Sequence, residues 1–239
     1  MTPRPESGRT FTDTRRVRLS DMDARGRVRL DALARLLQDI AIDDVQETGW
    51  GLPDHLWFVR AVRIDLASPF LEDAEIELTT WCNGHGAAAA GRRWSLIGDQ
   101  GGNAEVDSVW IHLDAGGRPA RLGAFGVYAE ASEGRAVTTR LALPDPPEGA
   151  VARRWPLRTT DLDRHGHVNN AIFWAAVEDS VVDDIDLRAP LRASLDYRGP
   201  LDHGDDLQVV AFGVDAGVGV GVGLLAGSEV RAVAVVKQR

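Results

Sequence analysis

The chain has 239 residues, 44% of them hydrophobic and 26% charged, a balance that is typical of a globular protein and excludes a disordered or fibrous chain. Its formal net charge of -9 argues against a nucleic-acid partner, and no apolar run approaches the roughly 18 residues of a membrane span. Residues 1–16 are polar and lack the apolar stretch of a signal peptide, and Cys82 is the only cysteine, so we expect a cytoplasmic protein without an internal disulfide.

An Asp-x-Asp-x-x-Gly turn at residues 21–26 precedes the first predicted helix. After it, apolar residues recur at intervals of three and four positions: Leu30, Leu33, Leu36, Leu37, Ile40, Ala41 and Val45. This spacing predicts an amphipathic helix. Four β-type segments follow the helix, at residues 58–65, 74–81, 92–97 and 105–113. A helix followed by consecutive strands with short turns predicts an antiparallel sheet rather than alternating βαβ units.

A stretch rich in turn-forming residues separates the two halves of the chain. It contains a series of glycines and prolines: Gly116, Gly117, Pro119, Pro144, Pro146, Pro147 and Gly149. Around residues 121–131 a short helix and a short strand are both compatible with the sequence. We expect a first unit, a linker and a second unit, at residues 1–115, 116–154 and 155–239.

The second unit repeats the pattern of the first. Four turn residues, Asp21, Asp23, Gly26 and Val28, recur as Asp161, Asp163, Gly166 and Val168. Further matches follow in the same order: Gln38-Asp39 with Glu178-Asp179, Ile64-Asp65 with Leu195-Asp196, and Glu105-Val106 with Glu229-Val230. The offset between the copies falls steadily along the chain, as shorter loops in the second copy would produce. The sequence therefore predicts a tandem duplication.

The second copy has its own helix and strands. Residues 172–177 are apolar on every face, so the second helix should be buried. Valine and glycine alternate over residues 218–223, which predicts a strand whose glycine face another segment approaches closely. We expect an α+β protein in which each unit is an antiparallel sheet wrapped around one long helix.

The turn before the second helix carries the residues with chemical potential. Within residues 160–170 lie two Asp, two His and two Asn: Asp161, Asp163, His165, His167, Asn169 and Asn170. The first copy has Arg25, Arg27, Arg29 and Leu30 in place of the two His and the two Asn. The Asp residues recur and are compatible with a structural role, whereas the His and Asn residues require another explanation.

This turn resembles the signature of the acyl-ACP thioesterase family, an Asp-x-Asn-x-His-Val-Asn-Asn run that enters the second helix of a tandem double hotdog. The resemblance extends over nearly the whole chain and includes the segments Thr80-Trp81, Ser108-Val109-Trp110 and Asp196-Tyr197-Arg198. It implies a double-hotdog fold. It also implies that Asp163 and His167 are the catalytic Asp and His, followed by the family's Asn pair at 169–170.

Two positions depart from the plant members of that family. His165 stands where they have Asn, and Pro200-Leu201 stands where they have a Glu-Cys pair. A thiol mechanism at that position is therefore excluded. We expect Glu178, on the second helix, to supply the acidic group, although it is also compatible with a solvent-facing or capping role.

The start of the second helix suggests how a thioester would be hydrolysed. Backbone N–H groups of Gly166, His167 and Val168 would polarise the thioester carbonyl at the positive end of the helix. Asp163 would activate water, with His167 or His165 as acid and base. Asn169 or Asn170 would orient the water, although an Asn before a helix is equally typical of an N-cap. The spacing of Asp163, His165 and His167 is not that of a zinc motif, and we expect no metal or cofactor.

Four aromatic residues of the first copy are candidates for the acyl pocket, and equally for the core: Trp50, Trp57, Phe58 and Trp81. Two stretches rich in arginine, at 15–29 and 153–158, are compatible with a solvated face or with docking of an acidic carrier or of a phosphopantetheine phosphate. The tandem provides its own internal dimer, so we expect a monomer or a homodimer.

The resemblance implies a hydrolase that releases free fatty acid from acyl-ACP. Acyl-CoA hydrolysis by the same chemistry is the nearest alternative. A hotdog dehydratase or hydratase fits less well, since its His-containing loop and central-helix acid differ in spacing from residues 163–170. A non-catalytic acyl-binding protein is the third class, and it predicts bound lipid without turnover.

Overall fold

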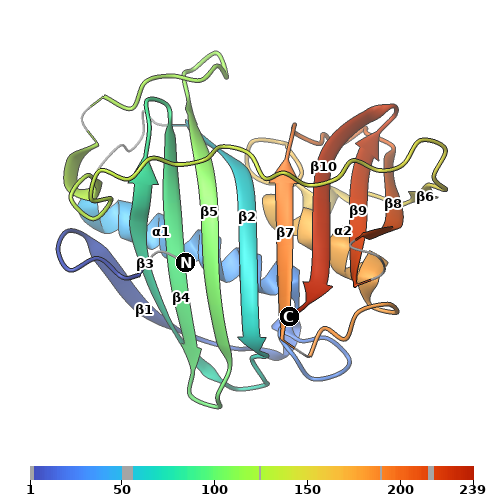
Figure 1. Cartoon of the computed structure of the whole chain (residues 1–239), viewed down its shortest axis with the longest axis horizontal. Helices are drawn as coiled ribbons and strands as arrows, with labels where there is room; N and C mark the ends of the chain where they lie inside the picture. Colours follow the sequence, from blue (N-terminus) through green and yellow to red (C-terminus); the bar gives the residue numbers. More distant parts are fainter. Residues whose placement is uncertain (1–2, 50–55, 124, 189, 215–217) are drawn as a thin grey trace.

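The computed structural model describes residues 3–49, 56–123, 125–188, 190–214 and 218–239. Over these residues the chain forms one ten-stranded antiparallel sheet with two long helices on a single face (Figure 1). The strand order is β1-β3-β4-β5-β2-β7-β10-β9-β8-β6. The expected antiparallel sheet with one helix in each half is present.

The first half contributes β1–β5 and helix α1 (Leu30–Thr48). Its strands are β1 (Thr10–Arg16), β2 (Leu56–Ser68), β3 (Glu75–His85), β4 (Ala89–Gly98) and β5 (Asn103–Leu113). Helix α1 ends at Gly49, whose φ of 63° is a left-handed conformation that glycine adopts without steric cost. Apolar residues of α1, including Leu33, Leu37 and Ile40, pack into the core, as their spacing predicts.

The second half contributes β6–β10 and helix α2 (Asn170–Val181). Its strands are β6 (Arg153–Arg154), β7 (Leu191–Tyr197), β8 (Leu207–Val214), β9 (Gly219–Ala226) and β10 (Glu229–Gln238). Helix α2 is buried along most of its length, with Phe173, Trp174 and Val177 in the same core cluster as the apolar residues of α1. The predicted burial of this helix is confirmed.

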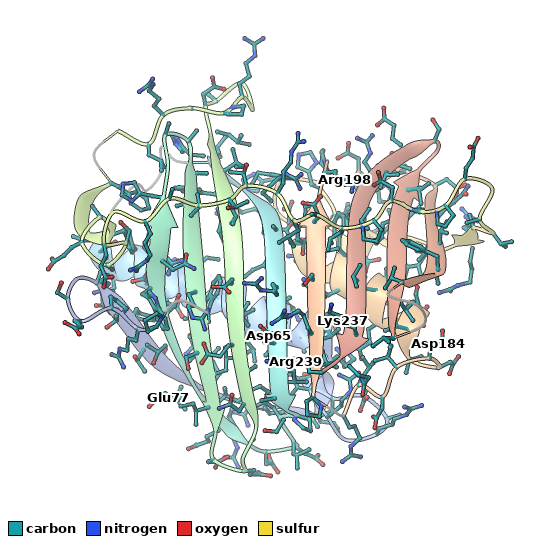
Figure 2. The ribbon with its side chains drawn as sticks, in the orientation of Figure 1. Asp65, Glu77, Asp184, Arg198, Lys237 and Arg239 are labelled. Atoms are coloured by element: carbon teal, nitrogen blue, oxygen red, sulfur yellow. The ribbon has the colours of Figure 1, made fainter. Side chains whose placement is uncertain are left out.

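The two halves join edge to edge through β2 and β7. Antiparallel pairing runs from Ala61 opposite Asp196 to Leu66 opposite Leu191. Two buried carboxylates, Asp65 and Asp196, each receive an arginine from the other strand. Figure 2 shows Asp65 and Arg239 near each other at this seam, and an ion pair joins them at 3.7 Å. The seam therefore makes one continuous sheet of the two halves.

The segment between β5 and β6 crosses the face of the sheet that is turned away from the helices (Figure 1). It includes a short 3-10 helix at Gly126–Tyr128. A Cβ atom placed on Gly223 would lie 2.3 Å from the ring of Pro146, so only glycine fits under this segment. The close approach predicted at the Val/Gly strand is confirmed at Gly223.

In the described parts of the chain, neither long helix combines the length and hydropathy that crossing a membrane requires.

Candidate active site at the start of the second helix

The turn before each helix is built in the same way. Asp163 Oδ1 accepts hydrogen bonds from the backbone N–H groups of His165 (2.8 Å) and His167 (3.2 Å). Asp23 makes the two corresponding bonds in the first half. Gly166 has a φ of 85°, the left-handed conformation that closes the turn. Asp163 therefore holds the turn through one of its two oxygens.

The other oxygen distinguishes the two turns. Asp23 Oδ2 lies 3.1 Å from the guanidinium Nε of Arg27. In the part of the chain that the structure describes, no side chain or backbone donor reaches Oδ2 of Asp163. Asp163 thus combines a structural oxygen with a free one, which is compatible with both roles considered for it.

His167 pairs with a carboxylate that the sequence analysis did not select. Its Nδ1 lies 2.5 Å from Asp202 Oδ1, and about half of each side chain is exposed. The backbone also joins here, because Val168 N–H donates to the Leu201 carbonyl at 2.8 Å. Since Asp202 engages Nδ1, the opposite ring nitrogen of His167 is left to act as a base.

Asp202 directly follows the Pro200-Leu201 pair, where the sequence departs from the plant enzymes. This departure from the family pattern could have identified Asp202 in the sequence. Asp202 is the next residue after the unusual pair, and its carboxylate reaches His167. His165 behaves differently: its side chain is exposed, and its Nε2 lies 3.1 Å from Arg164 Nε.

The backbone donors proposed for the thioester carbonyl are occupied. Gly166 N–H donates to the Asp163 carbonyl, His167 N–H to the Asp163 carboxylate and Val168 N–H to the Leu201 carbonyl. That prediction is wrong, because the turn and the adjoining strand end consume all three donors. A substrate oxygen must find its donor further into the helix.

The Asn pair divides into a cap and a free donor. Asn169 Oδ1 accepts from Ala171 N–H at 2.9 Å, so Asn169 is the N-cap of α2. Asn170 is the first residue of the helix, and its N–H has no acceptor among the described residues. The Asn170 carbonyl accepts from the Tyr197 hydroxyl at 3.0 Å, and burial raises the pKa of Tyr197, so this hydroxyl stays a neutral donor.

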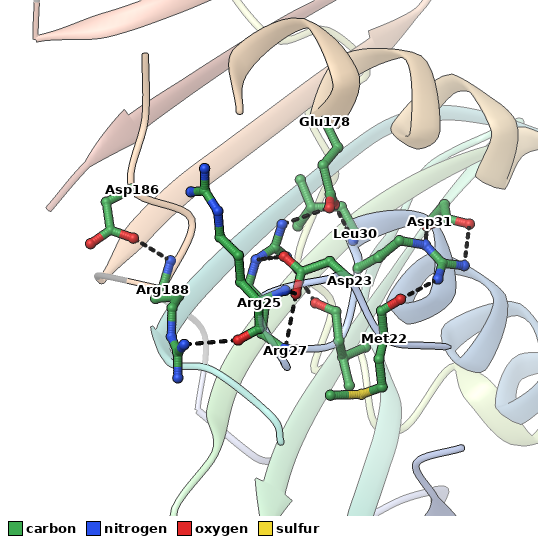
Figure 3. Close-up of polar contacts among 11 residues, drawn as sticks. Met22, Asp23, Arg25, Arg27, Leu30, Asp31, Glu178, Asp186 and Arg188 are labelled. Atoms are coloured by element: carbon green, nitrogen blue, oxygen red, sulfur yellow. Dashed lines mark hydrogen bonds and ion pairs between the residues drawn. The ribbon is translucent and has the colours of Figure 1, made fainter. Parts of the chain in front are cut away.

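The corresponding N–H in the first half carries a carboxylate. Leu30, the first residue of α1, donates its N–H to Glu178 Oε2 at 2.6 Å, while Arg27 binds Glu178 Oε1 at 2.6 Å (Figure 3). Burial raises the pKa of Glu178, whereas Arg27 and the Leu30 N–H lower it. An anion therefore occupies the start of α1, as the positive end of a helix favours.

Glu178 is consequently not part of the turn that holds His167. It lies eight residues beyond Asn170, which is about 12 Å along the helix axis. The prediction that Glu178 supplies the acid of the second turn is wrong, because its carboxylate crosses to the first half. The residue that matches Glu178 in the repeat is Gln38 on α1, and this match could have drawn attention to Gln38, which lines the same cavity as Asn170.

Gln38 and Asn170 line the same cavity between the two helices and the sheet. The cavity itself is small, about 30 Å³, and the empty space that includes its opening to solvent is about 340 Å³. Most of the wall is apolar and comes from α1, α2, β2, β4, β5 and β7; it consists of Ala34, Leu37, Gln38, Val59, Val62, Trp94, Ser108, Trp110, Asn170, Trp174 and Tyr197. The free N–H of Asn170 thus belongs to a residue at the wall of an apolar cavity.

Of the four aromatic residues expected to form an acyl pocket, the three that the structure describes do not line this cavity. Trp81 lies on the opposite face of the sheet from the cavity residue Trp94, since it is Thr80 that pairs with Trp94, and it borders a groove that Pro3 and Arg4 also line. Trp57 packs against the His112 ring at 5.4 Å in a separate small cluster. Phe58 packs on the main core outside the cavity wall. Trp50 lies outside the described residues.

Most of the predicted arginine patch is neutralised locally. Ion pairs join several of these arginines to nearby acids: Arg15 to Asp43, Arg16 to Asp73, Arg29 to Asp31, Arg153 to Asp179, Arg154 to Asp206 and Arg158 to Asp161. This pairing favours the solvated-face interpretation for those positions. Within the described residues, no three His, Cys, Asp or Glu side chains converge as metal ligands would.

Fold and site together define a double-hotdog protein with its polar turn at the start of the second helix. Two family models match the chain, the acyl-ACP thioesterase N-terminal domain over residues 8–122 and the C-terminal domain over residues 145–223. The chain belongs to the acyl-ACP thioesterase family, and it is a thioester hydrolase. The resemblance and the α+β double-hotdog fold expected from the sequence are confirmed.

The chain is also similar to a curated relative and, in its fold, to solved structures. An uncharacterized protein from Mycobacterium tuberculosis strain H37Rv is 30% identical over 217 residues, which cover 87% of this chain and 85% of the relative. The fold is similar to an acyl-ACP thioesterase from Bacteroides thetaiotaomicron, with a TM-score of 0.77, 19% identity and coverage of 95% and 97% of the two chains. It is also similar to the 12:0-ACP thioesterase from Umbellularia californica, with a TM-score of 0.79, 16% identity and coverage of 96% and 97%.

Proposed function

We propose that this protein hydrolyses fatty acyl-ACP to free fatty acid and ACP at the start of α2. The observation that carries the proposal is the contrast between two equivalent N–H groups. Leu30 N–H holds the carboxylate of Glu178, whereas Asn170 N–H has no acceptor among the described residues and belongs to the wall of an apolar cavity. A negative oxygen is accommodated at the first position, so the second can receive the oxyanion of a thioester intermediate.

The proposed reaction combines that N–H with the polar side chains of the turn that precedes it in the sequence. His167, with Asp202 on its Nδ1, takes a proton from water, and the water oxygen forms a bond to the thioester carbon. The carbonyl oxygen becomes an oxyanion that accepts from Asn170 N–H. When the carbon–sulfur bond breaks, His167 returns the proton to the departing thiolate. The free oxygen of Asp163 holds the water, and Gln38 orients the thioester from the opposite wall.

The family assignment supports an acyl carrier protein as the source of the acyl group. The test is hydrolysis of matched acyl-ACP and acyl-CoA substrates of several chain lengths. The rate is measured through the release of the free thiol. Faster turnover of acyl-ACP supports the proposal. Faster turnover of acyl-CoA would assign the protein to CoA thioesters, and bound lipid without turnover on either carrier would indicate an acyl-binding protein.

The role of Asp163 can be separated from its turn. An Asn at this position keeps one oxygen for the two turn hydrogen bonds but loses the carboxylate. We expect Asp163→Asn to fold and to lower kcat by about 10²-fold, because the water loses its charged partner. Asp23→Asn, the matched change in the first half, should leave kcat unchanged. Full activity of Asp163→Asn would restrict Asp163 to holding the turn.

A further inference from the structure

The wall of the cavity contains a buried hydrogen-bond donor that the protein itself does not satisfy. Trp94, on β4, is only 2% exposed and lines the cavity. Its indole Nε1–H has no hydrogen-bond partner among the described residues. Buried indole N–H groups are normally paired, because leaving one without an acceptor costs free energy.

A second polar group lies beside it. Trp94 is opposite Val106 and Arg92 is opposite Ser108 in the pairing of β4 with β5, so Trp94 and Ser108 are diagonal neighbours on one face of the sheet. Ser108 Oγ accepts from Trp110 Nε1 at 2.7 Å and donates to the Arg92 carbonyl at 3.3 Å. The wall residues here therefore include a buried N–H without a partner and a hydroxyl that already has two partners, rather than apolar groups alone.

The polar character continues beyond the cavity on the same face. Arg92 donates to Asp44 at 2.6 Å and to the Thr80 hydroxyl at 3.3 Å, and Asp44 is 1% exposed. A hydrocarbon tail that reached this region would leave the Trp94 N–H unpaired. An oxygen atom on the tail would pair with it.

Trp94 is far from the position assigned to the thioester. Tyr197, which bonds to Asn170, lies on β7, and the sheet order from β7 to β4 passes through β2 and β5. Three strand spacings amount to roughly 14 Å. Trp94 therefore belongs to the part of the cavity wall that would meet the distal half of an acyl chain whose carbonyl is at Asn170.

We propose that the acyl group carries an oxygen atom, as a hydroxyl or a carbonyl, in its distal half, and that this oxygen accepts a hydrogen bond from Trp94. The inference rests on the function proposed above and specifies the substrate class of the same site. The Ser108 hydroxyl on the neighbouring strand already donates its hydrogen to the Arg92 carbonyl, so it can add only an accepted hydrogen bond, from a substrate hydroxyl. Unsubstituted acyl chains are then the poorer substrates.

The test compares decanoyl, 3-hydroxydecanoyl and ω-hydroxydecanoyl thioesters on one carrier. For the wild type we expect kcat/KM to be about 10-fold higher for the ω-hydroxy substrate than for decanoyl, the selectivity of one buried hydrogen bond. The 3-hydroxy compound should show little of this advantage. A second readout needs no turnover. It is the ratio of the Kd values of the decanoyl and ω-hydroxydecanoyl amide analogues, in which nitrogen replaces the thioester sulfur.

Two variants isolate the indole N–H. Trp94→Phe should bring the ratio close to one, and replacement of Trp94 by 3-benzothienylalanine, which keeps the ring shape without the N–H, should do the same. Trp81→Phe is the matched control, because Trp81 is equally buried and its N–H is also unpaired, but it lies on the other face of the sheet. Its ratio should equal that of the wild type.

The outcomes separate this inference from the proposed function. A Kd ratio near one in the wild type overturns the oxygenated substrate, whether or not thioesters are hydrolysed. A ratio that survives loss of the Trp94 N–H also overturns it. Absence of turnover together with a Kd ratio of about 10 would reject the hydrolysis and retain the recognition of an oxygenated chain.

Discussion

The turns that lead into the two helices have the same backbone hydrogen bonds. They differ in whether a carboxylate occupies the first N–H of the helix. At α1, Glu178 and Arg27 fill the space in front of the Leu30 N–H with a buried ion pair. At α2, the equivalent N–H of Asn170 has no acceptor among the described residues, Asn170 lines a cavity, and the preceding turn carries His167. The duplication thus supplied two equivalent anion positions, and the side chains decided that one would be closed and the other left available.

Each half contributes a side chain to the other half, and the identity of that side chain explains why the anion position at α1 is filled. Glu178 belongs to the second half and serves the first, whereas Gln38 belongs to the first half and lines the cavity of the second. A carboxylate facing each turn would have blocked both positions. The amide of Gln38 leaves Asn170 N–H free because a neutral side chain is less strongly attracted to the positive end of a helix.

Removing His167 should produce the largest effect on the open site. We expect His167→Ala to lower kcat by about 10³-fold, because the base for water and the acid for the leaving thiolate are lost together. His165→Ala is the control, since that side chain is exposed against Arg164, and its kcat should stay near the wild-type value. Steady-state hydrolysis of one acyl thioester measures both. Equal losses in the two variants would contradict the assignment to His167.

Removing the carboxylate that fills the start of α1 should lower the stability of the protein. Glu178→Ala leaves the guanidinium of Arg27, 1% exposed, without its principal carboxylate, and we expect a loss of about 3 kcal/mol in the free energy of unfolding. Asp179→Ala breaks the exposed pair with Arg153, and should cost no more than about 1 kcal/mol. Urea unfolding gives both values. A loss of the same size in both variants would show that the buried pair is not special.

The closed site should also make stability depend on pH. Folding raises the pKa of Glu178, so the folded state holds the proton to a higher pH than the unfolded chain does. Stability from this group is fully present below the unfolded pKa of about 4.5 and declines as pH rises through the folded pKa. The wild type should therefore lose stability relative to Glu178→Gln over that interval in urea unfolding. The opposite slope would mean that Arg27 outweighs burial.

Asp202 provides a further test of the difference between the two helix starts. Its pair with His167 is needed only at the open site, at the start of α2. Asp202→Asn still offers an oxygen to His167 Nδ1 but no charge, and we expect kcat to fall about 10-fold, since the half-exposed pair is screened by water. Asp206→Asn, nearby on the chain and paired with Arg154, is the control. Unchanged activity in Asp202→Asn would leave His167 to act alone.

The sequence predicted the elements of the fold well because those depend on local patterns. The spacing of Leu30 to Val45 indicates a helix, and the repeat of the Asp-x-Asp-x-x-Gly turn indicates two similar units. The partner of Glu178 could not be predicted with the same method, because the contact between Glu178 and Leu30 joins residues 148 positions apart. The packing of the two helices against each other determines such contacts.

The residues chosen for the acyl pocket and described by the structure, Trp57, Phe58 and Trp81, differ from those that line the cavity for a related reason. Strand residues alternate between two faces, so Trp81 and Trp94 look equally suitable in the sequence although they lie on opposite sides of the sheet. The backbone donors failed because the turn uses them internally, and only the pairing of Val168 with Leu201 reveals this. Asp202 was within reach of the sequence analysis, since it directly follows a position already identified as unusual.

The smallest expected effect separates a cap from a catalytic group. Asn169→Ala removes the acceptor of Ala171 N–H, and we expect a loss of about 1 kcal/mol in the free energy of unfolding. Asn169→Asp keeps the cap and should restore this stability, because a carboxylate at the start of a helix is favourable. If Asn169 acts only as a cap, kcat measured well below the unfolding temperature should be similar in both variants. A large fall of kcat in a stable Asn169→Asp variant would instead mean that the amide contacts the reacting groups, as the family's Asn pair suggested.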